Sequence, residues 1–94
     1  MKNIEIENLA INQVIVHSNL ENVSYLYSYN RVVMAYNRNF RIMHVDRTYG
    51  FYSKTTSKYM TKFLESCGKY ISLKDLRNRL NDLSDNEYIW KDLN

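Results

Sequence analysis

The chain of 94 residues has no proline, one cysteine and two glycines. The single cysteine, Cys67, cannot form an internal disulfide, so we expect the protein to work in a reducing cytoplasm. The two glycines are isolated and cannot build a glycine-rich loop for nucleotide phosphates. The sequence has no run of about 18 apolar residues, which argues against a membrane-spanning helix. Its first residues lack the apolar region of a secretory signal, so we expect none.

Groups for catalysis and metal binding are also sparse. The two histidines, His17 and His44, lie on different predicted strands, and neither belongs to a nucleophile motif. Two separated histidines and one cysteine do not supply the three or four ligands of a metal site. We interpret His44 as a partly buried histidine and Cys67 as a core residue. The sequence therefore predicts a protein that is not an enzyme and that holds no metal or cofactor.

The composition is typical of a folded domain that is rich in tyrosine. Hydrophobic residues make up 45% and charged residues 24% of the chain, which argues against disorder. Nine tyrosines suit both strands and contact surfaces. The sequence shows no repeat, linker or low-complexity tract, so we expect one domain over residues 1–94. A chain of this length has a small core, with little room for a deep cleft.

The first half of the chain predicts β-structure. Apolar and polar residues alternate with a period of two, and β-branched and aromatic residues are frequent. We predict strands near residues 13–17, 23–29, 32–36, 40–45 and 48–52, and residues 4–7 also fit a short strand. Turns at Asn30–Arg31 and at Asn37–Asn39 separate three of them. Such short turns favour an antiparallel meander of about three to five strands.

The second half changes to a helical period. Residues 55–67 carry one apolar stripe, with hydroxyl side chains for an N-cap and Gly68 for a left-handed C-terminus. Residues 73–83 have leucines spaced by three and four, after the capping residue Ser72. Residues 85–93 fit a short third helix, which we prefer, or a last strand from Glu87 to Trp90. The fold class is therefore α+β, with two or three C-terminal helices packed on one face of the sheet.

Positive charge is concentrated in the middle of the chain. Residues 31–62 carry seven basic side chains and one acidic side chain, a net charge of +6. Arginines could hold a nucleic-acid backbone there while tyrosines stack on bases, which gives the candidates Arg38, Arg41, Arg47, Tyr36 and Tyr49. The alternatives are that the cations are solvated and that the tyrosines pack beneath the helices.

A second candidate site is the start of the first predicted helix. Lys54, Thr55, Thr56 and Lys58 combine hydroxyls and ammonium groups with the free N–H groups of a helix N-terminus. This arrangement suits an anion such as phosphate. The alternative is an ordinary helix cap with its lysines in solvent.

Two stretches resemble small uncharacterised proteins of bacteriophages and mobile elements. Residues 28–35 read SYNRVVMA and residues 52–64 read YSKTTSKYMTKFL. They are similar to SYxTxVA and YSxTTSxHxxKFL in those proteins, over roughly residues 24–64. The chain departs from that pattern at Tyr59, where histidine is usual, and at Arg31, where threonine or a similar residue is common. The resemblance implies a genetic setting and no particular activity.

These observations favour a binding protein of phage or mobile-element origin that blocks a host defence system. The expected target in the bacterial cytoplasm is an RNA-guided nuclease complex, which would make the protein an anti-CRISPR-type inhibitor. A basic chain would contact an acidic protein surface or nucleic-acid phosphates. The alternative is a small regulator that binds DNA or RNA directly. We expect no membrane partner, and a tyrosine-rich sheet face left uncovered is compatible with a homodimer.

Overall fold

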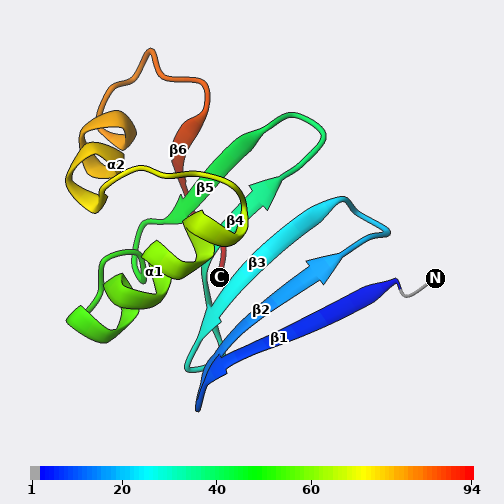
Figure 1. Cartoon of the computed structure of the whole chain (residues 1–94). Helices are drawn as coiled ribbons and strands as arrows, with labels where there is room; N and C mark the ends of the chain where they lie inside the picture. The colour runs from blue at the N-terminus through cyan, green and yellow to red at the C-terminus, as the bar shows by residue number, and fades with distance from the viewer. Residues whose placement is uncertain (1–2) are drawn as a thin grey trace.

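The computed structural model describes residues 3–94 and contains one sheet and two helices in that range (Figure 1). The elements in chain order are β1 (Ile4–Ala10), β2 (Gln13–Ser18), β3 (Val23–Ser28), β4 (Arg31–Asn37), β5 (Ile42–Asp46), α1 (Lys54–Ser66), α2 (Leu73–Leu80) and β6 (Tyr88–Lys91). The predicted α+β class is confirmed. The sheet is larger than predicted, with six strands among the described residues where we expected three to five.

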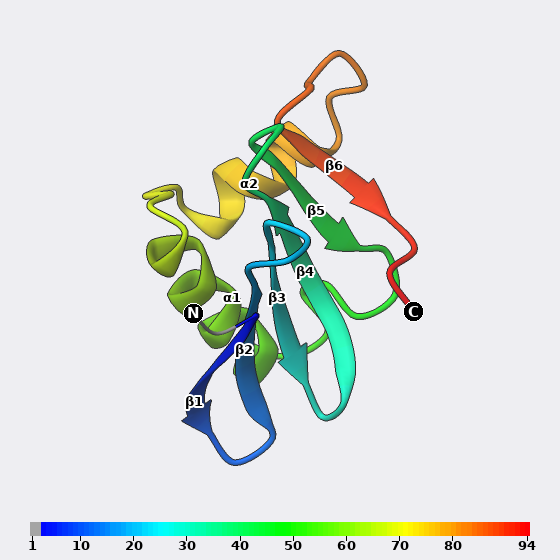
Figure 2. The same cartoon turned by 90° about the vertical axis from the view of Figure 1, so that its right-hand side faces the viewer.

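The strands follow one another across the sheet in the order β1-β2-β3-β4-β5-β6. The first five pair antiparallel through short turns, as the meander prediction requires. At the β3–β4 turn, Tyr29 and Asn30 both have positive φ, so the tight turn lies one residue earlier than predicted. β6 pairs parallel to β5, because the chain passes through both helices before it returns to the sheet (Figure 2).

The predicted strand at residues 48–52 is wrong, because this segment is a turn. The Asp46 carboxylate accepts the backbone N–H groups of Thr48 and Tyr49, and Gly50 N–H bonds to the Asp46 carbonyl. These bonds fold the chain back on itself directly after β5. The strand former Tyr49 therefore lies in a loop that leads to α1.

The two helices begin where the sequence predicts. The Ser53 and Ser72 hydroxyls accept the backbone N–H groups three residues later, and Gly68 has the left-handed φ of 76° expected after α1. The second helix is shorter than predicted, since it ends at Leu80 and Leu83 is fully exposed. These caps depend only on neighbouring residues, which explains why the helix starts are visible in the sequence.

The preferred third helix at residues 85–93 is also wrong, because this segment contains β6. The Asp85 carboxylate accepts the N–H groups of Glu87 and Tyr88 and bonds to the Arg79 guanidinium at 2.6 Å. Asp85 therefore fixes the turn that leads into the strand. The free edge of β5 then supplies backbone partners over four residues.

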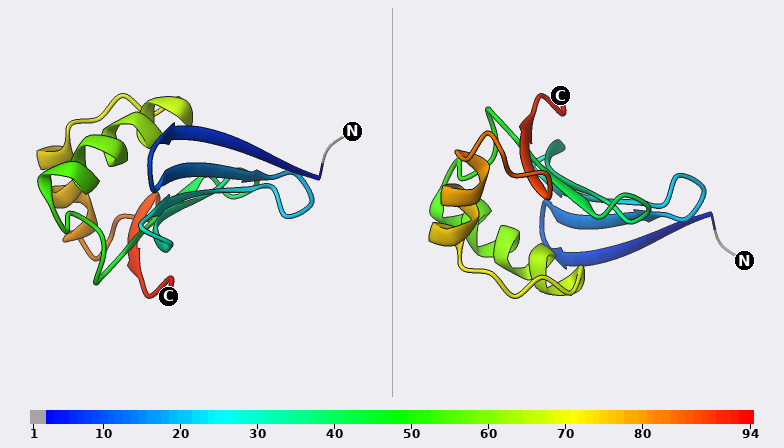
Figure 3. Two further views of the ribbon diagram at one scale, coloured as in Figure 1. Left: turned by 90° about the horizontal axis from the view of Figure 1, so that it is seen from below. Right: turned by 90° about the horizontal axis from the view of Figure 1, so that it is seen from above.

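Both helices lie on one side of the sheet, where they enclose the core (Figures 2 and 3). Met60, Phe63 and Leu64 of α1 are completely buried, as is Leu76 of α2. The sheet contributes alternate residues of each strand to the same core, among them Ile15, Leu26, Met34, Met43 and Val45. In β3 the serine and leucine positions face the helices, and the tyrosines face away.

No helix within residues 3–94 covers the opposite side of the sheet, which we call the open face. The strand register places ten largely apolar side chains on it. These ten are Ile4, Ile6, Val14, Val16, Tyr25, Tyr27, Val32, Ile42, His44 and Ile89, and the same register places Lys91 and the buried Asp46 on this side. Ile4 and Ile6 of the edge strand β1 are 57% and 63% exposed. The predicted uncovered sheet face is therefore present.

Candidate functional site

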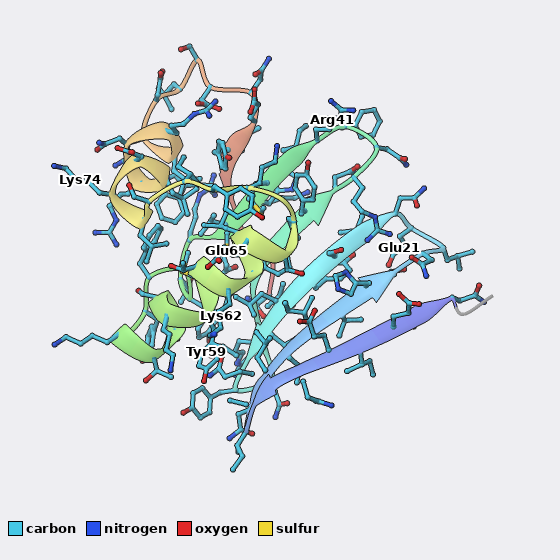
Figure 4. All side chains as sticks on the ribbon, in the orientation of Figure 1. Glu21, Arg41, Tyr59, Lys62, Glu65 and Lys74 are labelled. Atoms are coloured by element: carbon cyan, nitrogen blue, oxygen red, sulfur yellow. The ribbon has the colours of Figure 1, made fainter. Side chains whose placement is uncertain are left out.

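The three candidate arginines lie at different places in the fold. Arg38 folds onto the sheet, where its guanidinium donates to Ser24 Oγ at 2.6 Å and to the Ser18 carbonyl at 3.0 Å. Arg41 lies in the β4–β5 turn, away from the helices (Figure 4). Arg47 follows the other end of β5, about 20 Å along the strand from Arg41, and pairs with Asp92. The arginines therefore do not gather on one surface.

The two candidate tyrosines are also separated. Tyr36 is 8% exposed on the helix-facing side of β4, beneath the Lys69 ammonium at 5.5 Å. Tyr49 is half-buried in the loop after β5, where the Arg31 guanidinium lies 5.4 Å from its ring centre. Tyr36 is thus part of the core surface, whereas Tyr49 lies beside a cation and a cavity.

The candidate residues at the start of α1 divide into the buried Thr56, which belongs to the helix cap, and three exposed side chains. Ser53 is the N-cap, and its hydroxyl bonds to both the N–H and the Oγ1 of the buried Thr56. Thr55, Lys54 and Lys58 are exposed, and the Lys58 ammonium lies 5.5 Å from the Tyr59 ring centre. The first turn of α1 contains no acidic residue, so nothing in that turn neutralises the positive end of the helix dipole.

Positive charge gathers on the two helices and their connection. Residues 54–80 carry seven basic and two acidic side chains, a net charge of +5 that exceeds the +3 of the whole chain. Lysines at intervals of four lie opposite the buried side of α1. We call the following set the basic helical layer: Lys54, Lys58, Lys62, Lys69, Lys74 and Arg77. Figure 4 shows Lys62 and Lys74 on this layer.

The basic helical layer differs from the predicted patch in its members, because it contains only two of the predicted cations. The charge count along the sequence predicted a basic patch within residues 31–62. In the folded chain, however, Arg38 and Arg47 bond to polar and acidic partners. Counting charge per predicted helix would not have found the basic helical layer either, because residues 55–67 and 73–83 each sum to +1 and Lys54 and Lys69 lie outside those ranges. The carboxylates of α1 and α2 are few, and Arg79 is occupied by Asp85 and Glu87.

A polar row that the sequence did not reveal crosses β1, β2 and β3 and ends at Arg38, directly after β4. Arg38 donates to Ser24 Oγ, which lies 2.7 Å from His17 Nδ1, and His17 Nε2 lies 3.7 Å from the Glu7 carboxylate. A serine in contact with a histidine that is itself in contact with an acid resembles a hydrolytic triad. However, Ser24 is 2% exposed, and its oxygen already accepts a bond from Arg38. The row therefore ties the strands together and offers no accessible nucleophile.

The other reactive side chains lie apart from this row. Burial raises the pKa of the Cys67 thiol to about 12, which leaves it protonated at neutral pH. Burial, together with the nearby Lys91 charge, lowers the pKa of His44 on the open face. Within residues 3–94, no group of three histidine, cysteine or acidic side chains could hold a metal ion. In the same range, no helix is long and apolar enough to cross a membrane.

The fold and the charge distribution define an α+β protein with a basic helical layer on one side of its sheet and an apolar open face on the other. The chain belongs to a family of unknown function, DUF8033, whose model matches residues 2–78. The matched segment contains β1 to β5 and α1 and ends within α2. No curated protein and no solved structure matches the chain.

Proposed function

We propose that this chain is a non-enzymatic binding protein of phage or mobile-element origin that inhibits a host defence complex. The preferred target is an RNA-guided nuclease complex in the bacterial cytoplasm, which the chain engages through its basic helical layer. Its resemblance to phage proteins over residues 24–64 supports the setting. The net charge of +5 on residues 54–80 is the observation that supports binding through this layer.

Electrostatics favour an anionic surface as the partner of this layer. Six cations on the two helices and their connection, with only Glu65 and Asp75 among them, raise the local positive potential. Guide RNA, target DNA or an acidic protein groove presents the opposite charge. A chain with this charge does not imitate DNA, so inhibition follows from occupying a site that normally contacts nucleic acid.

The positions of the reactive side chains support a role without catalysis. His17 lies on the helix-facing side of the sheet, whereas His44 lies on the open face. The Cys67 thiol is held protonated. These three groups therefore cannot act on one substrate.

Charge reversal tests the proposal. The triple variant Lys54→Glu, Lys58→Glu, Lys62→Glu changes the exposed side of α1. The matched control Arg31→Glu, Arg41→Glu, Arg47→Glu changes the net charge equally at sites outside both the basic helical layer and the open face. We expect the wild type and the control to co-elute with a purified RNA-guided nuclease complex and to reduce its interference with plasmid DNA. We expect the triple variant to lose both effects. Failure of the wild type to bind or inhibit any such complex would reject the proposal.

The second candidate is direct binding of DNA or RNA, and the same basic helical layer favours it. Direct binding weakens steeply with salt, because each phosphate contact contributes about 0.9 to the slope of log affinity against log salt. A gel-shift titration at several salt concentrations separates the candidates. Tight binding to naked nucleic acid at physiological salt, with a slope that falls in the α1 triple variant, supports the regulator instead of the inhibitor.

We also propose that the open face joins two copies of the chain. Six strands about 4.8 Å apart and about six residues long span roughly 29 by 20 Å, or about 580 Å² per copy. Two such faces would bury more than about 1,000 Å², the lower bound of a specific interface. Among the side chains that the register places on the open face, only Lys91 of the edge strand β6 is both charged and exposed, so repulsion between two copies is confined to that edge.

Sedimentation of matched variants tests this interface. Ile6→Glu places a carboxylate on the open face, whereas Leu83→Glu places one at a fully exposed site outside it. We expect a dimer mass for the wild type and for Leu83→Glu, and a monomer mass for Ile6→Glu. A monomeric wild type across the concentrations that solubility allows would overturn the proposal, as would an unaltered dimer in Ile6→Glu.

A further inference from the structure

A cavity of about 330 Å³ lies beside the start of α1, separate from the exposed lysines of the basic helical layer. Its walls come from the end of β3, the β3–β4 turn, the loop after β5 and the first turn of α1. The residues that line it include Ser28, Tyr29, Arg31, Tyr49, Tyr52 and Thr56. Cavities of about 300–1,000 Å³ are typical of small-molecule sites.

Aromatic rings and one cation dominate the mouth of this cavity. The Tyr49 and Tyr52 rings lie 6.0 Å apart with a tilt of 42°. The Arg31 guanidinium lies 5.4 Å from the Tyr49 ring centre and is exposed, and no carboxylate among residues 3–94 forms an ion pair with it. The mouth therefore offers an aromatic surface for a planar group and a charged fork for an oxyanion.

Two buried polar side chains, one in the cavity wall and one paired with it across β2 and β3, lack hydrogen-bond partners among the described residues. Ser28 lines the cavity and is 5% exposed, and its hydroxyl makes no hydrogen bond to any described residue. Gln13 faces Ser28 across the β2–β3 pair and is 1% exposed. Neither its amide oxygen nor its amide nitrogen has a partner among residues 3–94. Leaving such groups unpaired costs about 1–3 kcal/mol each. Of the two residues only Ser28 lines the cavity, and its hydroxyl points to an occupant that bonds to it.

The helix beside the cavity adds positive potential. α1 has 13 residues, and its first turn carries N–H groups without intrahelical partners. Thr56 brings this turn to the cavity wall. The helix dipole, the Arg31 charge and the absence of an acid in the first turn of α1 all favour a negative ligand.

We propose that this cavity binds a small planar organic anion, an aromatic ring system that bears a carboxylate or phosphate group. The anionic group lies on Arg31, the ring packs against Tyr49 and Tyr52, and a polar edge of the ligand reaches Ser28. An engineered cavity of about 150 Å³ holds benzene, so the present cavity has room for two fused rings with one substituent. This inference does not depend on the proposed defence target.

Titration of the full chain with defined probes tests the proposal. The probes are 2-naphthoate, the neutral 2-naphthamide and inorganic phosphate, followed by amide NMR shifts and calorimetry. We expect 2-naphthoate to bind with shifts around Ser28, Tyr49 and Thr56, and the neutral amide to bind at least about tenfold more weakly. Phosphate alone lacks the ring and should bind more weakly than 2-naphthoate.

Two variants and one control make the test decisive. Arg31 is exposed, so Arg31→Gln should fold normally, and we expect it to weaken 2-naphthoate binding about tenfold or more. Ser28→Ala should weaken it several-fold, while Arg41→Gln should leave it unchanged. Equal binding of 2-naphthoate by wild type and Arg31→Gln overturns the proposal, as does the absence of any shift at these residues. A more stable Ser28→Ala variant with unchanged binding overturns the role of Ser28.

Discussion

The side-chain oxygen Oδ1 of Asp46 accepts the backbone N–H of Leu93 at 2.7 Å, across 47 residues of sequence. The other carboxylate oxygen accepts the N–H groups of Thr48 and Tyr49 at 3.0 and 2.8 Å. One buried side chain thus ends β5, folds the following loop and fastens the segment after β6. Both departures from the predicted meander, the turn at residues 48–52 and the parallel strand, meet at this carboxylate.

Replacing Asp46 by asparagine should destabilise the fold by about 2–3 kcal/mol at neutral pH. An amide has one acceptor oxygen, so it cannot accept hydrogen bonds on both sides as the carboxylate does. Urea unfolding of the wild type and Asp46→Asn measures the difference. Equal midpoints and slopes would contradict the proposed role of the carboxylate.

The stability should also depend on pH through Asp46. Burial alone would raise the pKa of this carboxyl group, but hydrogen bonds from Leu93, Tyr49 and Thr48 outweigh burial and hold the pKa below its ordinary value. The ionised carboxylate therefore stabilises the fold above an ordinary pKa of about 3.9, and this stabilisation is lost as the pH falls through the folded-state pKa. Unfolding at pH 7 and near pH 3 should show a smaller acid loss in Asp46→Asn than in the wild type.

Gly50 and Gly68 should respond differently to replacement by alanine. A Cβ at Gly50 would lie 2.4 Å from Val45 Cγ1 and 2.6 Å from the Asp46 carbonyl oxygen, which requires the loop to shift. We expect Gly50→Ala to cost about 2–4 kcal/mol. Gly68 has open space but a φ of 76°, so Gly68→Ala should cost only about 1 kcal/mol. Thermal unfolding of both variants measures the two losses of stability. A larger loss in Gly68→Ala than in Gly50→Ala would contradict the prediction.

The polar row across β1 to β3 predicts an effect of Arg38 on stability. Arg38→Ala removes two charge-assisted hydrogen bonds, to Ser24 and to the Ser18 carbonyl, and should destabilise the fold by about 1.5–3 kcal/mol. The matched variant Arg41→Ala removes an exposed turn arginine and should change stability by less than about 0.5 kcal/mol. Chemical unfolding compares them. Similar small effects at both positions would show that the row adds no stability.

Cys67 should react slowly in the folded protein. With a pKa of about 12, its thiol is almost entirely protonated at pH 8. An unfolded chain has a thiol pKa of about 8.5, so alkylation by iodoacetamide should accelerate on the order of a thousandfold in denaturant. Mass spectrometry of timed samples measures both rates. Rapid labelling without denaturant would contradict the buried environment of the thiol.

Local patterns in the sequence were sufficient for much of the fold. The alternation in residues 23–29 correctly divided β3 into a tyrosine side and a serine–leucine side, because strand geometry alone sets that period. The apolar stripe and the residues Ser53 and Gly68 correctly bounded α1 to within one residue. These elements depend on contacts between residues near each other in sequence.

The sequence was insufficient where distant residues decide the structure. β6 has only four residues, and it becomes a strand because β5 presents a free edge to it. Likewise, the candidate arginines share a sequence region but not a surface, since Arg38 finds Ser24 and Arg47 finds Asp92 only in the folded chain. The unpaired amide of Gln13 and the cavity that Ser28 lines have no sequence signature at all.

The late position of β6 in the chain has a consequence for the order of folding. Each of the first four strand pairs closes through a short loop, whereas Met43 must find Tyr88 across 45 residues. Closing a longer loop costs more chain entropy, and contacts of high sequence separation slow folding. We therefore expect the hairpins to gain amide-exchange protection first and the C-terminal strand last, so that completion of the sheet is the committed step of folding.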